Sequence, residues 1–203
     1  GFTLGVDSSD YGLNGDSGNN TVAWSWKAGT TGSGTTTGSG TGKAYSYSVN
    51  TTAGFSIVQY VGNGSAGHTI PHHLGAAPKW IIVRKLEHAK DWNVYHAAMG
   101  ATKGMYLNLT NAQQTHTNWN DTHPTSTVFS LGSDDQVNGN NNSYIAYCFA
   151  EKQGYSKFSS YEGNSSSDGV FVYTGFKPSF VMVKNISAGQ SWWMWDNKRL
   201  GYN

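Results

Sequence analysis

The chain has 203 residues, of which only 12% are charged, against roughly 25% in an ordinary soluble protein. Thirteen basic and twelve acidic side chains give a formal net charge of +1 without a basic patch, so nucleic acid is not an expected partner. No apolar run approaches the roughly 20 residues that cross a bilayer, and residues 1–20 lack a signal peptide pattern, which argues against membrane insertion and secretion by that route.

The composition predicts an all-β protein. Gly, Ser, Thr and Asn favour turns over helices, while 12 Tyr, 8 Trp and 8 Phe suit pleated sheets. The single cysteine, Cys148, excludes an intrachain disulfide, and its place in an apolar run predicts a small buried side chain. The chain starts at Gly1 rather than Met, from which we expect processing or a piece of a longer polypeptide.

Along the chain, the first predicted element after residue 27 is a flexible linker or long loop over residues 28–53. Its core is Ala28 to Gly42, AGTTGSGTTTGSGTG, which has almost no apolar area to bury. Short β-branched or aromatic runs bounded by Gly, Pro, Asn or Asp then predict strands. These runs are residues 55–61, 79–85, 126–131, 143–150, 169–173 and 179–184. A helix is expected at most around residues 97–105. Many short strands with turns between them indicate a β-sandwich or jelly-roll-like fold.

Two segments of the chain recur at a spacing of about 100 residues. The first match joins residues 1–26 to 128–149, with four extra residues in the earlier loop. Its corresponding pairs are Phe2 and Phe129, Leu4 and Leu131, Gly5 and Gly132, Asp7 and Asp134, Asn14 and Asn138, Gly15 and Gly139, Ala23 and Ala146, Trp24 and Tyr147, Trp26 and Phe149. The second match joins residues 54–85 to 154–185. Its pairs, which continue just beyond it, are Gly75 and Gly175, Pro78 and Pro178, Trp80 and Phe180, Val83 and Val183, Arg84 and Lys184, Trp92 and Trp192.

The order of these segments predicts one complete repeat unit and two half-units. Residues 1–27 form the C-terminal half of a unit, residues 54–151 the complete unit, and residues 152–203 the N-terminal half of a second unit. The two halves either meet within the chain or complete neighbouring units in a longer polypeptide or a polymer. Unpaired strand edges on a half-unit would invite another chain to add its strands.

The segments VAWSWKAG, GFSIVQYVGNGSAGHTIPHHLGAAPKWIIVRK, DWNVYHAAMGATKGMYLNLT, VFSLGSDDQVNG, YIAYCFAEKQGYSKFSSYEGN and DGVFVYTGFKPSFVMVK carry a resemblance over nearly the whole chain. They resemble a repeat of tail-fibre-like and other structural proteins of marine and environmental bacteriophages. The resemblance implies a non-enzymatic virion component in a tail fibre, an appendage, or a decorating or fibre-forming subunit, assembled in the host cytoplasm and exposed extracellularly. It implies partners among other copies of the chain and other virion proteins, and a role in host attachment. His73 departs from the pattern, which has Gly there.

Aromatic residues are the candidates for carbohydrate binding, because exposed rings offer flat, stiff faces to sugars. They are Trp193, Trp195, Trp92 and Tyr95. Strand alternation places Trp193 and Trp195 on one face and Trp192 on the other, and one of these faces is expected to be core. A lectin-like module recognising host surface glycans is therefore the alternative to a purely structural role.

Histidines and acidic loops raise the question of a metal ion. His68, His72 and His73 are close in sequence, yet the matching positions hold Asp168, Val172 and Tyr173, so we predict no metal site and no cofactor. The loops of residues 5–18 and 132–142 contain oxygen ligands of the kind calcium prefers, but turn formation by Asp, Asn and Gly accounts for them.

Catalysis has no sequence motif to support it. The chain lacks a GxSxG elbow, an HExxH pair, a Walker sequence and a zinc-type cysteine pair, so no catalytic residue is assigned. A glycan depolymerase with two loop carboxylates is the enzymatic alternative, although nothing selects two of the twelve acids.

Overall fold

The computed structural model describes residues 2–4, 23 and 25–198, and within them the fold is all-β, as predicted. The regular structure of this part consists of antiparallel strands and one short helix, α1 (Asp135–Asn138). The strands of the first half are β1 (Thr30–Thr35), β2 (Thr37–Gly38), β3 (Ala44–Asn50), β4 (Phe55–Val61), β5 (His68–Pro71), β6 (Trp80–Lys85) and β7 (Asn93–His96). Those that follow are β8 (Lys103–Tyr106), β9 (Gln114–Thr115), β10 (Val128–Leu131), β11 (Ser143–Phe149), β12 (Phe180–Val183) and β13 (Trp193–Asp196).

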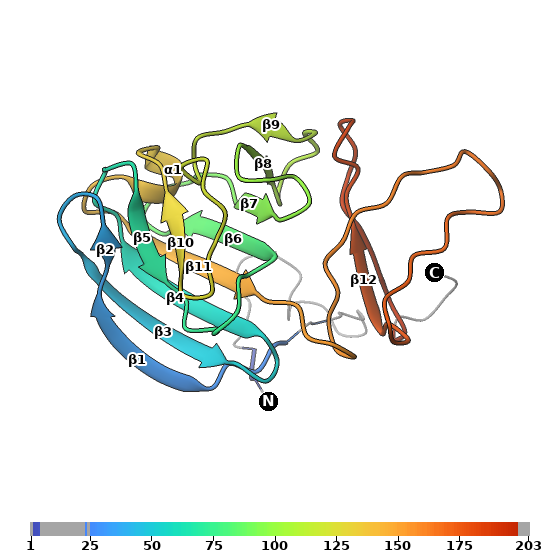
Figure 1. Ribbon diagram of the computed structural model, residues 1–203, viewed down its shortest axis with the longest axis horizontal. Coiled ribbons are helices and arrows are strands. Elements are labelled where there is room, and N and C mark those ends of the chain that lie inside the picture. Colours follow the sequence, from blue (N-terminus) through green and yellow to red (C-terminus); the bar gives the residue numbers. More distant parts are fainter. Residues whose placement is uncertain (1, 5–22, 24, 199–203) are drawn as a thin grey trace.

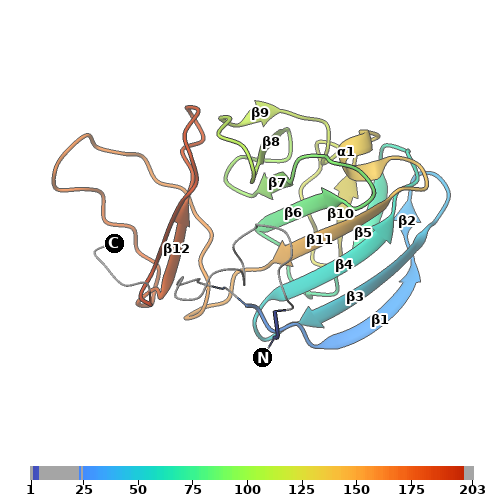
Figure 2. The same cartoon turned by 180° about the vertical axis from the view of Figure 1, so that it is seen from behind.

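Two antiparallel sheets pack face to face in a sandwich (Figures 1 and 2). The large sheet has eight strands in the order β1-β3-β4-β11-β6-β7-β8-β9, and the small sheet has the order β10-β5-β2. One apolar core fills the space between them and joins side chains of β4, β6 and β11 to side chains of β5 and β10. Burial of these side chains, at about 25 cal/mol per Å² of apolar surface, is the main force that holds the two sheets together.

The large sheet is apolar on both of its faces. In β6, Ile81 and Val83 point into the sandwich core, whereas Trp80 and Ile82 belong to a second cluster on the opposite face. That outer cluster also contains Phe149 and is partly covered by residues of the C-terminal segment. Because a strand buried on both faces needs apolar residues at successive positions, the unbroken run of residues 80–83 has a direct structural reason.

The predicted linker over residues 28–53 is wrong, since this region contains three strands. β1 pairs with β3 along its whole length, with Gly32 opposite Tyr47 and Gly34 opposite Tyr45. A Cβ atom on Gly32 would lie 2.6 Å from the Tyr47 hydroxyl oxygen, and one on Gly34 would lie 2.9 Å from Tyr45 ring atoms. The glycines therefore make room for aromatic rings that lie across β1, and the sandwich extends from residue 30 to residue 149.

Five of the other predicted strands are confirmed, and one is wrong. Residues 55–61 form β4 as predicted, and β6, β10, β11 and β12 begin or end within two residues of their predicted bounds. Residues 169–173 form no strand, and the Phe171 side chain is 85% exposed. No helix forms over residues 97–105, where turns lead into β8. The short helix lies instead at α1, where the Asp134 carboxylate accepts a hydrogen bond from the Gln136 N–H at 2.8 Å.

The strands β12 and β13 form a hairpin beside the sandwich with the same register as β6 and β7. Phe180 pairs with Asp196 and Val183 with Trp193, while Trp80 pairs with His96 and Val83 with Asn93, so each partner number differs by 100. The match extends beyond the strands. The Ala97 N–H donates to the Lys79 carbonyl at 2.8 Å, and the Asn197 N–H donates to the Ser179 carbonyl at 3.1 Å.

Candidate functional site

The β12–β13 hairpin is held against the large sheet by hydrogen bonds to residues 106–113. The Lys184 ammonium donates to the Thr110 carbonyl at 2.9 Å, and the Trp192 indole N–H donates to the Tyr106 carbonyl at 3.0 Å. The Gln113 N–H donates to the Ile186 carbonyl at 3.0 Å. Partial burial lowers the pKa of Lys184, which also donates to the carbonyls of Asn185 and Gln190. These contacts fix which side of the hairpin faces the sheet.

An apolar pocket of about 510 Å³ lies between the hairpin and the outer face of the large sheet. Its lining is almost wholly aromatic or aliphatic, with four tryptophans, and comprises Trp26, Phe55, Ile57, Trp80, Ile82, Trp92, Leu107, Tyr147, Phe149, Phe180, Met182, Trp192 and Met194. The Trp26 ring is 5.8 Å from Phe149 and 6.5 Å from Phe180, so it bridges sheet and hairpin. Met182 and Met194 were not predicted to line a site. The signal in the sequence was strand alternation: Met194 lies between Trp193 and Trp195 and so points to the other side of the strand, where it pairs with Met182.

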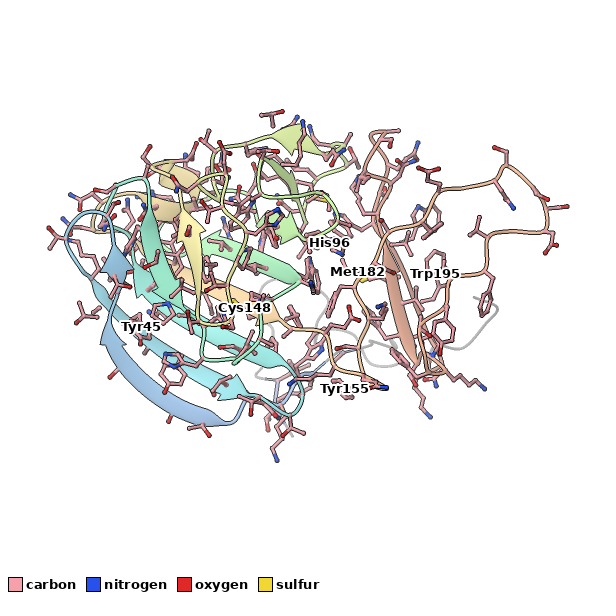
Figure 3. All side chains as sticks on the ribbon, in the orientation of Figure 1. Tyr45, His96, Cys148, Tyr155, Met182 and Trp195 are labelled. Atoms are coloured by element: carbon pink, nitrogen blue, oxygen red, sulfur yellow. The ribbon has the colours of Figure 1, made fainter. Side chains whose placement is uncertain are left out.

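The opposite side of the hairpin faces away from the sheet and carries the predicted aromatic pair. The Trp193 and Trp195 rings stack with centroids 6.1 Å apart and planes 15° apart. Trp192 lines the pocket, so the predicted separation of Trp193 and Trp195 from Trp192 is confirmed. Met182 and Trp195 are labelled in Figure 3 on opposite sides of the hairpin. We call Val181, Trp193 and Trp195 the open face, because Val181 is 38% and Trp193 57% exposed.

The other two carbohydrate candidates offer no comparable ring face. Tyr95 is 1% exposed in the sandwich core, where its hydroxyl is hydrogen-bonded to His123 Nδ1 at 2.9 Å. Burial raises the pKa of Tyr95 to about 12. Trp92 lines the pocket and lies 5.8 Å from the Arg84 guanidinium. The expectation for Tyr95 is wrong because its strand faces the interior of a complete sandwich, and the structure does not bring it together with Trp193.

The three histidines that were weak metal candidates each have partners within the protein. His68 is fully buried, with Nδ1 2.9 Å from Asn138 Oδ1 and Nε2 2.6 Å from Thr36 Oγ1. The Asn138 amide nitrogen donates to the carbonyls of Ser65 and Gly132, so its oxygen is the acceptor for His68 Nδ1–H. This arrangement holds a neutral imidazole, and burial lowers the pKa of His68.

His72 and His73 differ in their surroundings. His72 Nδ1 accepts from the Leu74 N–H and its Nε2 lies 3.2 Å from the Thr125 carbonyl, while burial lowers its pKa to about 4. His73 stacks on Tyr47 at a ring distance of 3.7 Å and has a φ angle of 60°. A left-handed conformation at this position is the one that glycine adopts most readily. Among the described residues no three His, Cys, Asp or Glu side chains gather in a group that could hold a metal ion.

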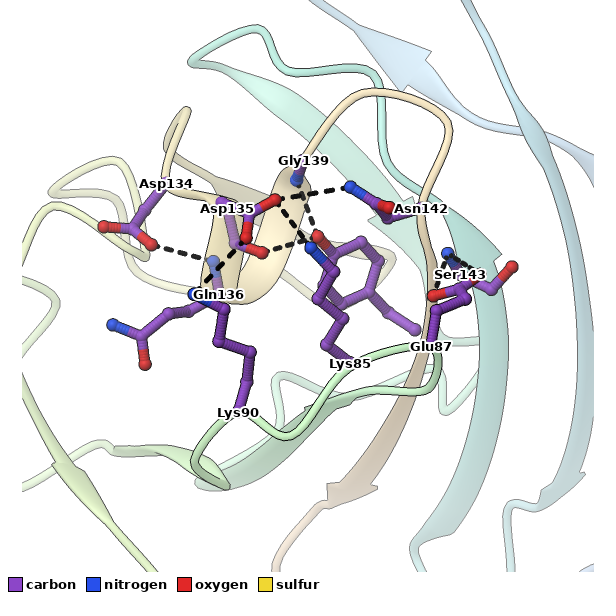
Figure 4. A network of polar contacts seen from close by, with 10 residues as sticks. Lys85, Glu87, Lys90, Asp134, Asp135, Gln136, Gly139, Asn142 and Ser143 are labelled. Carbon is purple, nitrogen blue, oxygen red and sulfur yellow. Dashed lines mark hydrogen bonds and ion pairs between the residues drawn. The ribbon is translucent and has the colours of Figure 1, made fainter.

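The acidic loop at residues 132–142 is tied into a polar network (Figure 4). The Asp135 carboxylate lies 2.7 Å from the buried Lys85 ammonium and 3.6 Å from the Lys90 ammonium. The hydrogen bond from Lys85 lowers the pKa of Asp135. Asp134 caps α1, so both carboxylates have structural partners without an ion. The earlier acidic loop, residues 5–18, lies outside the described residues.

Cys148 is fully buried in β11, and burial raises the pKa of its thiol, in agreement with the small buried side chain that was predicted. In the described ranges no helix has the length and apolar character needed to cross a bilayer.

The fold and these faces define an all-β protein, a two-sheet sandwich with a docked aromatic hairpin. Over residues 1–203 the chain matches the family described as "Domain of unknown function (DUF7483)", and it belongs to that family. Neither a curated protein nor a solved structure matches it.

Proposed function

We propose that this chain is a non-enzymatic structural component of a bacteriophage virion, in a tail fibre, an appendage or a decorating subunit. The proposal draws on the resemblance of its sequence segments to repeats of such proteins. It places the chain in the particle, with other copies of itself and other virion proteins as partners. Host attachment follows if many identical copies on one particle add their weak contacts together.

The observation that carries the proposal is the shared register of the two hairpins at a spacing of 100 residues. It supports a chain built from a repeated sandwich unit of about 100 residues, jelly-roll-like in kind. Residues 54–151 are the complete unit, to which β1, β2 and β3 add. Residues 1–27 and 152–203 are the two halves of another. Repetition of one packed module is a common way to build long, stiff assemblies.

Immunogold labelling of intact phage particles tests the proposal. An antibody raised against the purified chain should label one kind of structure on the particle, and mass spectrometry of washed particles should recover its peptides. A pre-immune serum is the control. Particles that contain no trace of the chain would contradict the proposal, as would release of reducing sugar from host polysaccharide by the purified chain.

A lectin-like module is the second candidate, and the exposed Trp193 ring stacked beside Trp195 favours it. Stacked indoles of this kind give a flat apolar surface to a sugar ring. Glycan array binding that is lost in Trp193→Ala and Trp195→Ala but kept in Tyr155→Ala would support this role. Tyr155 is a suitable control because it is 59% exposed but lies outside the hairpin.

A further inference from the structure

The open face of β12–β13 consists of positions that are interior in β6–β7. Val181 is 38% exposed, and its counterpart in register, Ile81, is 0% exposed. Trp195 is partly exposed, whereas Tyr95 is buried. The hairpin thus presents to solvent an apolar side of the kind that the sandwich buries. Exposed apolar clusters of this kind mark interaction sites in soluble proteins.

In the sandwich, strand β10 of the small sheet supplies part of the cover for β6–β7. Phe129 and Leu131 are buried in the same core cluster as Ile81 and Tyr95. They stand two residues apart in one strand, so both side chains point to the same side of the small sheet.

The chain contains a second segment with this pattern. Phe2 and Leu4 match Phe129 and Leu131 in the sequence repeat, and they are likewise two residues apart. Their side chains are 66% and 46% exposed. We call Phe2 and Leu4 the cover segment. The chain therefore carries a cover segment and an open face, both with exposed apolar side chains.

We propose that the open face binds a second copy of this chain through its Phe2 and Leu4 side chains. The inference rests on the structural role proposed above and names the partner surface for it. Phe2 and Leu4 are exposed in the single chain, as are Val181 and Trp193 of the open face, while Trp195 is partly exposed.

Charge and symmetry both suit association between copies. A formal net charge of +1 leaves little repulsion between identical chains. The two surfaces differ from each other, so the contact is heterologous, from the cover segment of one copy to the open face of the next. A heterologous contact whose rotation does not close a ring generates an open fibre.

Two double variants of the 203-residue chain test the proposal. The cover variant is Phe2→Ser with Leu4→Ser, and the face variant is Val181→Ser with Trp193→Ser. Leu86→Ser is the matched control, because Leu86 is 48% exposed on the sandwich and belongs to neither surface. Circular dichroism establishes that each variant is folded. Sedimentation velocity over a wide concentration range then measures self-association.

We expect the unaltered chain and Leu86→Ser to form oligomers that grow with concentration. Each double variant alone should weaken association at least about tenfold. An equal mixture of the two variants should form a heterodimer and nothing larger, because the cover variant keeps its open face and the face variant keeps its cover segment. This complementation is specific to a head-to-tail contact between the two surfaces.

Three results would overturn the inference. The unaltered chain could remain monomeric at every concentration, the double variants could associate as strongly as the control, or the mixture could remain monomeric. None of them bears on immunogold labelling of particles, so loss of this inference is distinguishable from loss of the structural role. If the unaltered chain remains monomeric, binding of a glycan to its open face would support the lectin-like module instead.

Discussion

The hairpins β6–β7 and β12–β13 pair their strands in one register, yet solvent reaches very different fractions of their side chains. In β6–β7, one side faces the small sheet and the other faces the pocket, so Ile81 and Val94 are both fully buried. In β12–β13, the pocket side lies against the large sheet, while Trp193 on the open face is 57% exposed. A hairpin sequence therefore specifies its register locally, whereas the burial of each side depends on which other strands lie against it.

The largest expected difference concerns the core positions of the two hairpins. Ile81→Ala removes a fully buried side chain and should lower the free energy of unfolding by about 2 to 5 kcal/mol. Val181→Ala at the matching position should cost less than about 1 kcal/mol, because solvent already reaches Val181. Urea unfolding followed by circular dichroism measures both. Equal losses would mean that the open face is buried in solution.

A fall in pH should act on the sandwich through His72. The folded-state pKa of His72, about 4, lies below the value of 6.5 for an unperturbed histidine, so the unfolded chain takes up the proton first as the pH falls. The contribution of this group to stability is therefore full above pH 6.5 and is lost progressively toward pH 4, by on the order of 3 kcal/mol. His68 acts in the same direction. The hairpin segment has Val172 where the sandwich has His72.

Urea midpoints measured across this pH window test the effect. In His72→Gln the fall in stability between pH 6.5 and pH 4 should be smaller, whatever that variant costs at neutral pH. His88→Gln is the control, because His88 lies exposed after β6. A pH dependence that is identical in His72→Gln and in the unaltered chain would assign the acid sensitivity to other groups.

The smallest effect on unfolding is expected at the contact between hairpin and sandwich. Lys184→Met keeps the apolar stem but removes the three hydrogen bonds to the carbonyls of Thr110, Asn185 and Gln190. The free energy of unfolding of the sandwich should change by less than about 1 kcal/mol, while limited proteolysis after residue 152 should become faster. Lys177→Met, at an exposed site in the same segment, should leave the cleavage rate unchanged.

The sequence predicted the elements whose signal is local. In β4, β6 and β11 the apolar residues are alternating or consecutive, and turn residues mark the ends of each strand. β1 was missed because its glycines have meaning only beside Tyr45 and Tyr47 of the next strand, which no local pattern reveals. Residues 169–173 have the composition of a strand, but within the described part of the chain no strand pairs with them.

The candidate site was predicted in part for the same reason. Alternation separated Trp193 and Trp195 from Trp192, since that depends only on the strand itself. The burial of Tyr95 and the pocket behind Met182 depend on how distant segments pack. Tyr95 and Trp195 are aromatic residues at matching positions of the two hairpins, yet their exposure to solvent differs.

Hydrogen–deuterium exchange at low and high protein concentration tests most directly whether one hairpin is covered and the other is open to a second copy. Amides of residues 80–96 should exchange slowly at both concentrations, because the sandwich protects them within a single chain. Amides of residues 180–196 should exchange faster at low concentration and become protected at high concentration, and the Phe2→Ser with Leu4→Ser variant should abolish that protection. Exchange in residues 180–196 that is equally slow at both concentrations, or that never changes with concentration, would contradict the account.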